Sequence, residues 1–394
     1  MSEGTAVNAA NASFVAKQSP CEDDELQMFR DNVRRFIQEE FVPIQRRWHE
    51  QQCPGPESWL LAGRNGILLP ELPEEYGGAG GSFFHEAVII EELARAGVHF
   101  GSSVHSIVAR YIISYGNEEQ KRRWLPRMAS GDLVGAVAMT EPSAGSDLAG
   151  IKTTARREGN EYLINGSKTF LTNGRCAGLV CLAAKTNPKI AGIKGISLIV
   201  LEVSKLDGYR VGRSLPKVGR PGQDVCEIFL DDVRVPADNL LGSAEGNGMS
   251  QMLEQLPYER LAVALSAVAT SERAIEITAQ YVKERTAFGQ PLLDLQNTRF
   301  KLAECATEAR IGRVFVDHCI MRLLEGTLDS VTAAMCKYWL TDSQCRIIDE
   351  CVQLHGGYGY MMEYPIANMW VDSRVQRIYA GANEVMKEII GWSL

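Results

Sequence analysis

The sequence predicts a mainly α-helical chain with a β domain in its middle. Apolar residues recur at helical spacing in the first third, short β-rich runs alternate with turn residues in the middle, and long helical patterns return in the last third. At 394 residues the chain is long enough for two or three domains. We therefore expect an N-terminal tail at 1–22, a helical domain at 23–133, a β domain at 134–246 and a helical domain at 247–394.

The composition is that of an ordinary globular protein. Hydrophobic residues make up 45% of the chain and charged residues 23%, which excludes a disordered or collagen-like protein. The 49 acidic and 41 basic side chains give a formal charge of -8, which disfavours nucleic acid as a partner because its phosphates would be repelled. No apolar run reaches the roughly 18 residues of a membrane span, so we expect no integral membrane segment.

The cysteines and the N-terminus indicate a cytoplasmic protein. The ten cysteines include no CxxC pair and no histidine at the spacing of a zinc site, so we expect reduced, mostly buried thiols and no metal centre. The first 20 residues contain no apolar core of a signal peptide, and no arginine precedes residue 30. Both a secretory signal and an organellar transit peptide are therefore disfavoured.

Helices are expected in the first domain, where apolar residues are three or four positions apart. Two such groups are Leu26, Phe29, Val33 and Phe36, and Ala87, Ile90, Leu93 and Ala94. Between them, the glycine-rich stretch 73–82 predicts a loop. It does not match a dinucleotide-binding fingerprint, because it lacks the preceding strand and the third glycine.

The middle domain is expected to be a small antiparallel sheet. Its β-rich runs at 162–164, 178–184, 196–203 and 226–235 are separated by turn-forming pairs such as Asn-Gly and Asp-Gly. In the last domain, the apolar periodicity predicts four helices with short breaks between them, at roughly 250–285, 292–325, 329–356 and 382–391.

Two segments of the middle domain have residues suited to bind a cofactor. The loop 138–147 combines turn-forming glycine and alanine with hydroxyl groups, and such a loop could cradle a polar ring or a phosphate. In the segment 165–174, strand alternation places Phe170 and Thr172 on one face and Leu171 on the other. An aromatic ring beside a hydroxyl could pack on a flavin and hydrogen-bond to it; the alternative is a hairpin with a buried phenylalanine.

Further motifs in the last third add a family resemblance. Together with the loops 138–147 and 165–174, the segments 281–290, 353–360 and 378–389 resemble the acyl-CoA dehydrogenase family, and most closely its long-chain and isovaleryl branches. The resemblance extends over roughly 23–391 in the family's order. It implies an N-terminal helical domain, a β-barrel domain and a C-terminal four-helix bundle, assembled as a homotetramer with one FAD per subunit.

The resemblance also assigns binding residues. Those that would contact FAD are Val137, Met139, Thr140, Gly145, Ser146, Phe170, Leu171, Thr172, Arg285, Phe288, Gln296, Gln353, Gly356, Gly357, Gly381, Asn383 and Glu384. The group from Arg285 to Gly357 would reach the FAD of a neighbouring subunit, with Arg285 on the pyrophosphate. Those that would contact the acyl-CoA substrate are Ser146, Arg260, Ala380 and Gly381. Ala382 replaces the threonine usual in the family, and His355 is expected to be structural.

Removal of hydrogen from Cα and Cβ of a thioester requires a base for the α proton and a hydride acceptor, which would be FAD. Many family members place a glutamate where this chain has Ala380. Long-chain and isovaleryl members instead carry the base in a motif like LPxERL, which is similar to 256–261 here, so Glu259 is the predicted catalytic base. Pro257 suits a first helical turn, and the apolar run 261–269 predicts a buried helix, which would raise the pKa of Glu259. Without the resemblance, a surface glutamate at a helix start is the simpler interpretation.

These assignments imply a reaction. The chain would oxidise a saturated acyl-CoA of medium, long or methyl-branched chain to the trans-2-enoyl-CoA in β-oxidation and pass electrons to electron-transfer flavoprotein. The backbone N–H of Ala380 and a ribityl hydroxyl of FAD would stabilise the enolate oxygen. The small residues after Phe100 would line the acyl pocket, unless Phe100 caps it. The alternatives are an acyl-CoA oxidase or flavin monooxygenase on the same fold, and a non-catalytic helical scaffold.

Overall fold

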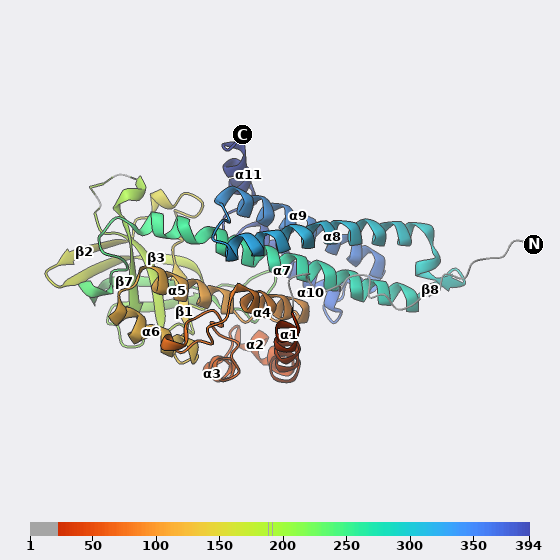
Figure 1. Cartoon of the computed structure of the whole chain (residues 1–394), viewed down its shortest axis with the longest axis horizontal. Helices are drawn as coiled ribbons and strands as arrows, with labels where there is room; N and C mark the ends of the chain where they lie inside the picture. Colours follow the sequence, from red (N-terminus) through yellow and green to blue (C-terminus); the bar gives the residue numbers. More distant parts are fainter. Residues whose placement is uncertain (1–22, 188, 191) are drawn as a thin grey trace, which may run out of the picture.

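In the computed structural model, residues 23–187, 189–190 and 192–394 are described, and the expected N-terminal tail at 1–22 lies outside them. Figure 1 shows three parts: orange-brown helices at the start of the chain, a yellow-green sheet at one end of the molecule, and long cyan-to-blue helices that extend to the other end. The predicted fold class, mainly helical with a central β domain, is confirmed.

The N-terminal domain consists of six helices. They are α1 (Asp24–Phe36), α2 (Gln45–Gln51), α3 (Pro56–Arg64), α4 (Phe83–Ala96), α5 (Ser102–Tyr115) and α6 (Glu118–Ala129). Asp23 caps α1, since its carboxylate accepts the N–H of Leu26 at 2.8 Å. The stretch 73–82 is a loop with one short 3-10 turn, as predicted. Phe100 is 1% exposed and packs on Trp59, with the ring centroids 4.3 Å apart, so it belongs to the core of this domain.

The β domain is a curled seven-stranded sheet. Its strands are β1 (Gly135–Ala138), β2 (Thr154–Glu158), β3 (Glu161–Thr172), β4 (Leu179–Lys185), β5 (Ile196–Glu202), β6 (Tyr209–Ser214) and β7 (Val225–Pro236). The order is β1-β4-β2-β3-β7-β6, with β5 on β4. The antiparallel prediction is confirmed for the β2–β3, β3–β7, β6–β7 and β4–β5 pairings, and it was wrong for the pairings of β4 with β1 and β2, which are parallel. Parallel neighbours need a long crossover, and the loop and hairpin between β1 and β4 provide it.

The C-terminal domain is a bundle of long helices. It contains α7 (Gly248–Glu284), α8 (Gln296–Leu324), α9 (Ser330–His355), α10 (Pro365–Ser373) and α11 (Asn383–Gly391). Helices α7, α8 and α9 pack on one another, and α10 and α11 pack on α9 (Figure 1). The four predicted helices are present, whereas α10 was not predicted.

Pro257 does not lie in a first helical turn, because α7 begins at Gly248. A proline in a helix interior leaves the carbonyl four residues earlier without its partner. That residue is Leu253, whose side chain is exposed, so solvent can reach the carbonyl on this side of the helix. Glu259 therefore lies in the body of a long helix, and its interpretation as a surface residue at a helix start is wrong.

Candidate active site

Glu259 lies on α7 and faces α5. The hydroxyl of Tyr111 donates to Glu259 Oε1 at 2.9 Å. Burial raises the pKa of Glu259 to about 7, against the opposing effects of this hydrogen bond and of the positive charges of Arg260 and Arg110. A carboxylate with this pKa is present in both protonation states near neutral pH, which suits a group that takes and returns a proton.

Arg260 is buried beside Glu259. Its Nη1 donates to Ser330 Oγ at 2.9 Å, at the start of α9, and it forms no ion pair with any residue that the structure describes. The buried Nε atom of Arg260 has no hydrogen-bond partner there either. The guanidinium lies against α9 inside the protein, and the contact of Arg260 with the CoA nucleotide stays a prediction.

The turn around Ala380 is held in an unusual conformation. Ala380 has φ 54 and Gly381 has φ 88, and only glycine adopts such values without strain. Lys337 of α9 is fully buried, and its Nζ donates to Gly381 O at 2.7 Å and to Asn383 Oδ1 at 2.9 Å. Burial, and then the charge of Arg260, lower the pKa of Lys337 to about 7. The turn therefore lies close to the Glu259–Arg260 segment and has a fixed shape.

Asn383, predicted to contact FAD, uses its side chain within the chain. Its Nδ2 donates to Thr341 Oγ1 and to Asp342 Oδ1, each at 2.9 Å, and its Oδ1 accepts from Lys337. Only its backbone remains available to a cofactor. Glu384, next in sequence, is exposed, and Gly381 and Ala382 are half-buried.

Phe170 and Thr172 lie on the outer face of β3. Phe170 is 67% exposed and Leu171 is 1% exposed, so the predicted division of faces is confirmed and a buried Phe170 is excluded. The β3–β7 pairing is irregular between Lys168 and Leu171, and Phe170 has φ 59. A strained, exposed aromatic residue of this kind is typical of a binding surface.

The loop 138–147 is fixed by a buried ion pair that the sequence analysis missed. Lys168 Nζ of β3 donates to Glu141 Oε1 at 2.8 Å and to Met139 O at 3.0 Å, and both charged side chains are almost fully buried. The loop is thereby attached to the strand that carries Phe170. Val137, Met139 and Thr140 are half-buried, whereas Gly145 and Ser146 are exposed.

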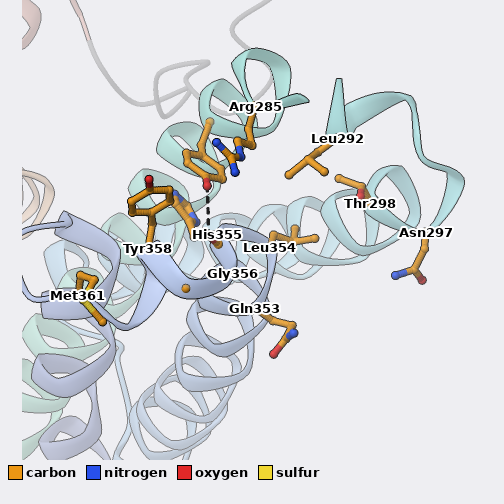
Figure 2. Close-up of a pocket in the computed structure, with 12 residues that line it drawn as sticks. Arg285, Leu292, Asn297, Thr298, Gln353, Leu354, His355, Gly356, Tyr358 and Met361 are labelled. Atoms are coloured by element: carbon orange, nitrogen blue, oxygen red, sulfur yellow. Dashed lines mark hydrogen bonds between the residues drawn. The ribbon is translucent and has the colours of Figure 1, made fainter. Parts of the chain in front are cut away.

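A pocket of about 660 Å³ lies where the ends of α7, α8 and α9 meet (Figure 2). Its lining includes Arg285, Gln353, Gly356 and Gly357, all predicted from the sequence to contact FAD. Gln296 precedes two further lining residues, and Phe288, 93% exposed, lies in the connection between α7 and α8.

The pocket combines a free positive charge with open space. Arg285 lies 5.8 Å from the ring centroid of Tyr358 and forms no ion pair with a described carboxylate. A Cβ added at Gly356 or Gly357 would meet no atom within 4 Å. An unpaired guanidinium beside an open glycine turn suits a phosphate group, so these residues fit the pyrophosphate part of a dinucleotide.

His355 has the contacts of a structural residue. Its Nδ1 is 2.8 Å from Cys351 O, and its ring stacks on Tyr281 with the centroids 4.3 Å apart. Burial lowers the pKa of His355, so the ring is neutral near pH 7. Tyr281 Oη also donates to the His355 carbonyl at 3.2 Å (Figure 2).

The two groups of predicted FAD residues are far apart in one chain. Along α7, about 38 Å of helix separates Glu259 from Glu284, at 1.5 Å per residue. In Figure 1 the sheet with β3 and the α7–α8 end with β8 (Thr286–Ala287) lie at opposite ends of the molecule. One cofactor cannot reach both groups of the same subunit.

Comparisons with known proteins identify the family. Three family models match the chain: acyl-CoA dehydrogenase N-terminal domain at 23–132, middle domain at 136–233 and C-terminal domain at 246–394. The chain belongs to the acyl-CoA dehydrogenase family. It is 44% identical over 366 residues to the long-chain specific acyl-CoA dehydrogenase, mitochondrial, of Sus scrofa, covering 92% of this chain and 85% of that protein.

Two other relatives support this membership. The chain is 32% identical to the isovaleryl-CoA dehydrogenase, mitochondrial, of Solanum tuberosum, covering 94% of this chain and 91% of that protein. The crystal structure of acyl-CoA dehydrogenase from Geobacillus kaustophilus matches with a TM-score of 0.91 and 43% identity over 95% of this chain and 99% of that chain. The predicted family and enzyme class are thus confirmed, while the cytoplasmic location stays a prediction. Over the described part of the chain, no helix combines the length and apolarity that a membrane crossing requires.

Proposed function

We propose that the chain is an FAD-dependent dehydrogenase that oxidises saturated acyl-CoA between Cα and Cβ, with Glu259 as the base. The observation that carries this proposal is the half-buried Glu259 carboxyl, bonded to Tyr111, with its pKa raised to about 7, in a chain that has an alanine at position 380. No carboxylate at position 380 is available to share the task.

Each part of the proposed reaction is assigned to particular residues. Glu259 takes the proton from Cα at a carboxylate oxygen, while the Tyr111 hydroxyl, hydrogen-bonded to Oε1, orients the carboxylate. The backbone N–H of Ala380 donates to the thioester oxygen, and Lys337 fixes that turn through Gly381 O. FAD, when bound, supplies the acceptor for the hydride from Cβ.

The flavin end of FAD would lie on Phe170 and Thr172, beside the loop 138–147, and its pyrophosphate would lie on Arg285 of another subunit. The length of α7 supports this arrangement, since it separates the two groups within one chain. Exposed apolar residues on α8 support assembly, because such surfaces mark interfaces. They are Phe300, Ile311, Val314, Met321 and Leu324. We therefore propose the homotetramer that the family resemblance implies.

The proposed substrates are acyl-CoAs of medium, long or methyl-branched chain, with electron-transfer flavoprotein as the electron acceptor. Support comes from the long-chain and isovaleryl relatives. In addition, Phe100 packs on Trp48 and Trp59 in the N-terminal core, which supports a pocket that Phe100 does not cap. The residues that follow it, at the start of α5, are small.

Anaerobic reduction of the flavin by acyl-CoAs tests the function. With wild type, straight chains of four to sixteen carbons and methyl-branched chains should bleach the flavin, and the preference should lie at eight carbons or more, or at a branched chain. Glu259→Gln should stay yellow and lose at least a hundredfold in rate, because general bases contribute about 10²–10⁴. Glu254→Gln, on an exposed position of the same helix, is the control and should match wild type.

Specific outcomes would contradict the proposal. Retention of more than about a hundredth of the rate in Glu259→Gln would exclude Glu259 as the base. Rapid reoxidation of the substrate-reduced enzyme in air would instead favour an acyl-CoA oxidase or monooxygenase. A colourless protein that binds no added FAD would favour a non-catalytic scaffold.

A further inference from the structure

Six of the cysteines that the structure describes lie in three thiol pairs. The thiols of Cys53 and Cys176, of Cys305 and Cys351, and of Cys319 and Cys336 lie close enough for each to shift the pKa of the other. The last two pairs connect α8 to α9 and are buried. In the first pair both residues are partly exposed, so a small solute can reach it. The prediction of mostly buried thiols is confirmed for the described cysteines, of which Cys53, Cys176 and Cys345 are the partly exposed ones.

The first pair connects two domains. Cys53 lies between α2 and α3, and Cys176 lies in the connection from β3 to β4. Cys176 Sγ is 3.7 Å from Pro54 O, directly after Cys53 in sequence. Arg175 Nη1 donates to Gln51 O at 3.0 Å, on the other side of Cys53. These backbone contacts on both sides hold the two thiols next to each other.

The two thiols have different electrostatic surroundings. The neighbouring thiol of Cys176 lowers the pKa of Cys53 to about 7, and the charge of Arg175 acts in the same direction, against burial and Asp224. The neighbouring thiol of Cys53, then burial and then the charge of Asp224, raise the pKa of Cys176, whose Sγ lies 3.8 Å from Asp224 Oδ2. Cys53 is therefore present in part as the nucleophilic thiolate near neutral pH, and Cys176 keeps its proton.

We propose that Cys53 and Cys176 form a redox-sensitive pair that a peroxide converts to a disulfide joining the N-terminal helical domain to the β domain. The Cys53 thiolate attacks a peroxide oxygen, the O–O bond breaks, and the product is the Cys53 sulfenic acid and hydroxide. Cys176 then attacks the Cys53 sulfur, the S–O bond breaks, and the Cys176 proton leaves with the departing hydroxide as water. In total two thiols lose two electrons to one hydrogen peroxide, which yields two waters.

The experiment uses the purified full-length protein and hydrogen peroxide. After brief exposure to a small molar excess, free thiols are alkylated, and a non-reducing digest is mapped by mass spectrometry. The Cys53–Cys176 cross-linked peptide should form at least tenfold faster than any product at the two buried pairs, and dithiothreitol should reverse it. The readout does not depend on dehydrogenase activity, so it is independent of the proposed function.

Single variants identify the steps. Cys176→Ser should accumulate a sulfenic acid at Cys53 that dimedone traps, and Cys53→Ser should show no cross-link at Cys176. Cys345→Ser is the matched control, since Cys345 is also partly exposed but contacts Ser373 and not a thiol. In this variant the Cys53–Cys176 cross-link should form as in wild type. Oxidation of the buried pairs at the same rate, or a wild-type Cys53 sulfenic acid that never yields the disulfide, would overturn the proposal.

Discussion

Tyr111 acts on the pKa of Glu259, the proposed base, through one hydrogen bond. That bond favours the ionised carboxylate, so it lowers the pKa of Glu259, although burial keeps it raised to about 7. Because only the ionised form can take a proton, flavin reduction in wild type should increase with pH through about 7 and then level off.

In Tyr111→Phe the midpoint of this profile should move upward. A hydrogen bond to a charged group contributes about 1.5–3 kcal/mol, which corresponds to about one to two pH units. Single-turnover reduction between pH 5.5 and 9.5 measures it. Tyr115→Phe, one helical turn later on α5, serves as the control, because its hydroxyl donates to Glu254 and not to Glu259. An unchanged or lowered midpoint in Tyr111→Phe would contradict the role of Tyr111.

The proposed base can also be moved from position 259 to position 380, where many family members carry a glutamate. In Glu259→Gly combined with Ala380→Glu, a carboxylate should approach Cα from the 380–381 turn and recover part of the reduction rate that Glu259→Gly alone loses. The φ of 54 at Ala380 is as tolerable for glutamate as for alanine, so the backbone should not change. Single-turnover reduction of both variants is compared. Equal rates in the two would show that the positions do not serve the same proton.

At this scale the sequence predicted the position of Glu259 and not its surroundings. The motif 256–261 is local, so it can be found in one chain. Tyr111 and Lys337 reach the site from other helices, and no local pattern marks Tyr111. Lys337 had one detectable signal, a lone charge in the otherwise apolar stretch of α9, which is typical of a buried and bonded lysine.

At the scale of elements, a buried glutamate couples the packing of α4 and α5 to pH. Glu86 of α4 is 2% exposed and accepts a hydrogen bond from Ser106 Oγ of α5 at 2.9 Å. Burial, and then the negative charge of Glu71, raise its pKa to about 8, while Ser106 and Arg110 oppose the shift. A carboxyl whose pKa is raised by folding makes its full contribution to stability below its unfolded pKa of 4.5, and this contribution is lost as pH increases from there to about 8, above which both states are ionised.

Glu86→Gln should therefore stabilise the protein at high pH. The amide resembles the protonated acid and keeps an acceptor for Ser106. Between about pH 5 and 8 the unfolded chain is ionised at Glu86 while the folded protein keeps the proton, so wild type should lose up to about 1.4 kcal/mol of unfolding free energy per pH unit relative to the variant, and the difference should level off above about pH 8. Urea unfolding at pH 6, 8 and 9.5 measures the difference, and Glu25→Gln on exposed α1 is the control. Parallel pH dependence of wild type and Glu86→Gln would refute this prediction.

The sequence predicted the bounds of helices well where the apolar periodicity extends over many residues. The four long patterns of the C-terminal domain became helices, because many turns of consistent spacing outweigh single residues such as Pro257. The parallel pairing of β4 did not follow, since it depends on which strands meet after a long crossover. Helix α10 has nine residues and follows a glycine-rich turn, too short for a clear period.

At the scale of the whole molecule, ion pairs join the N-terminal and C-terminal domains. Arg313 of α8 is 8% exposed and pairs with Glu272 of α7 at 2.9 Å and with Glu91 of α4. The charges of Glu91 and Glu272 raise the pKa of Arg313 against the effect of burial. Because α4 is fixed on the bundle in this way and α5 packs on α7, the Tyr111–Glu259 contact between domains has a rigid frame.

The pocket at the far end of the bundle gives a test of the assembly. If Arg285 binds the pyrophosphate of a cofactor held mainly by another subunit, Arg285→Ala should lose FAD and weaken the oligomer together. Leaving a buried phosphate without its counter-charge costs about 2–5 kcal/mol. Flavin-to-protein ratio and elution volume are measured together by gel filtration at decreasing protein concentration.

Lys283→Ala, two residues earlier and also exposed, is the control and should keep both flavin and assembly. Full flavin content in an intact oligomer of Arg285→Ala would show that the phosphate is bound elsewhere, and loss of assembly with full retention of flavin would assign Arg285 to the interface alone.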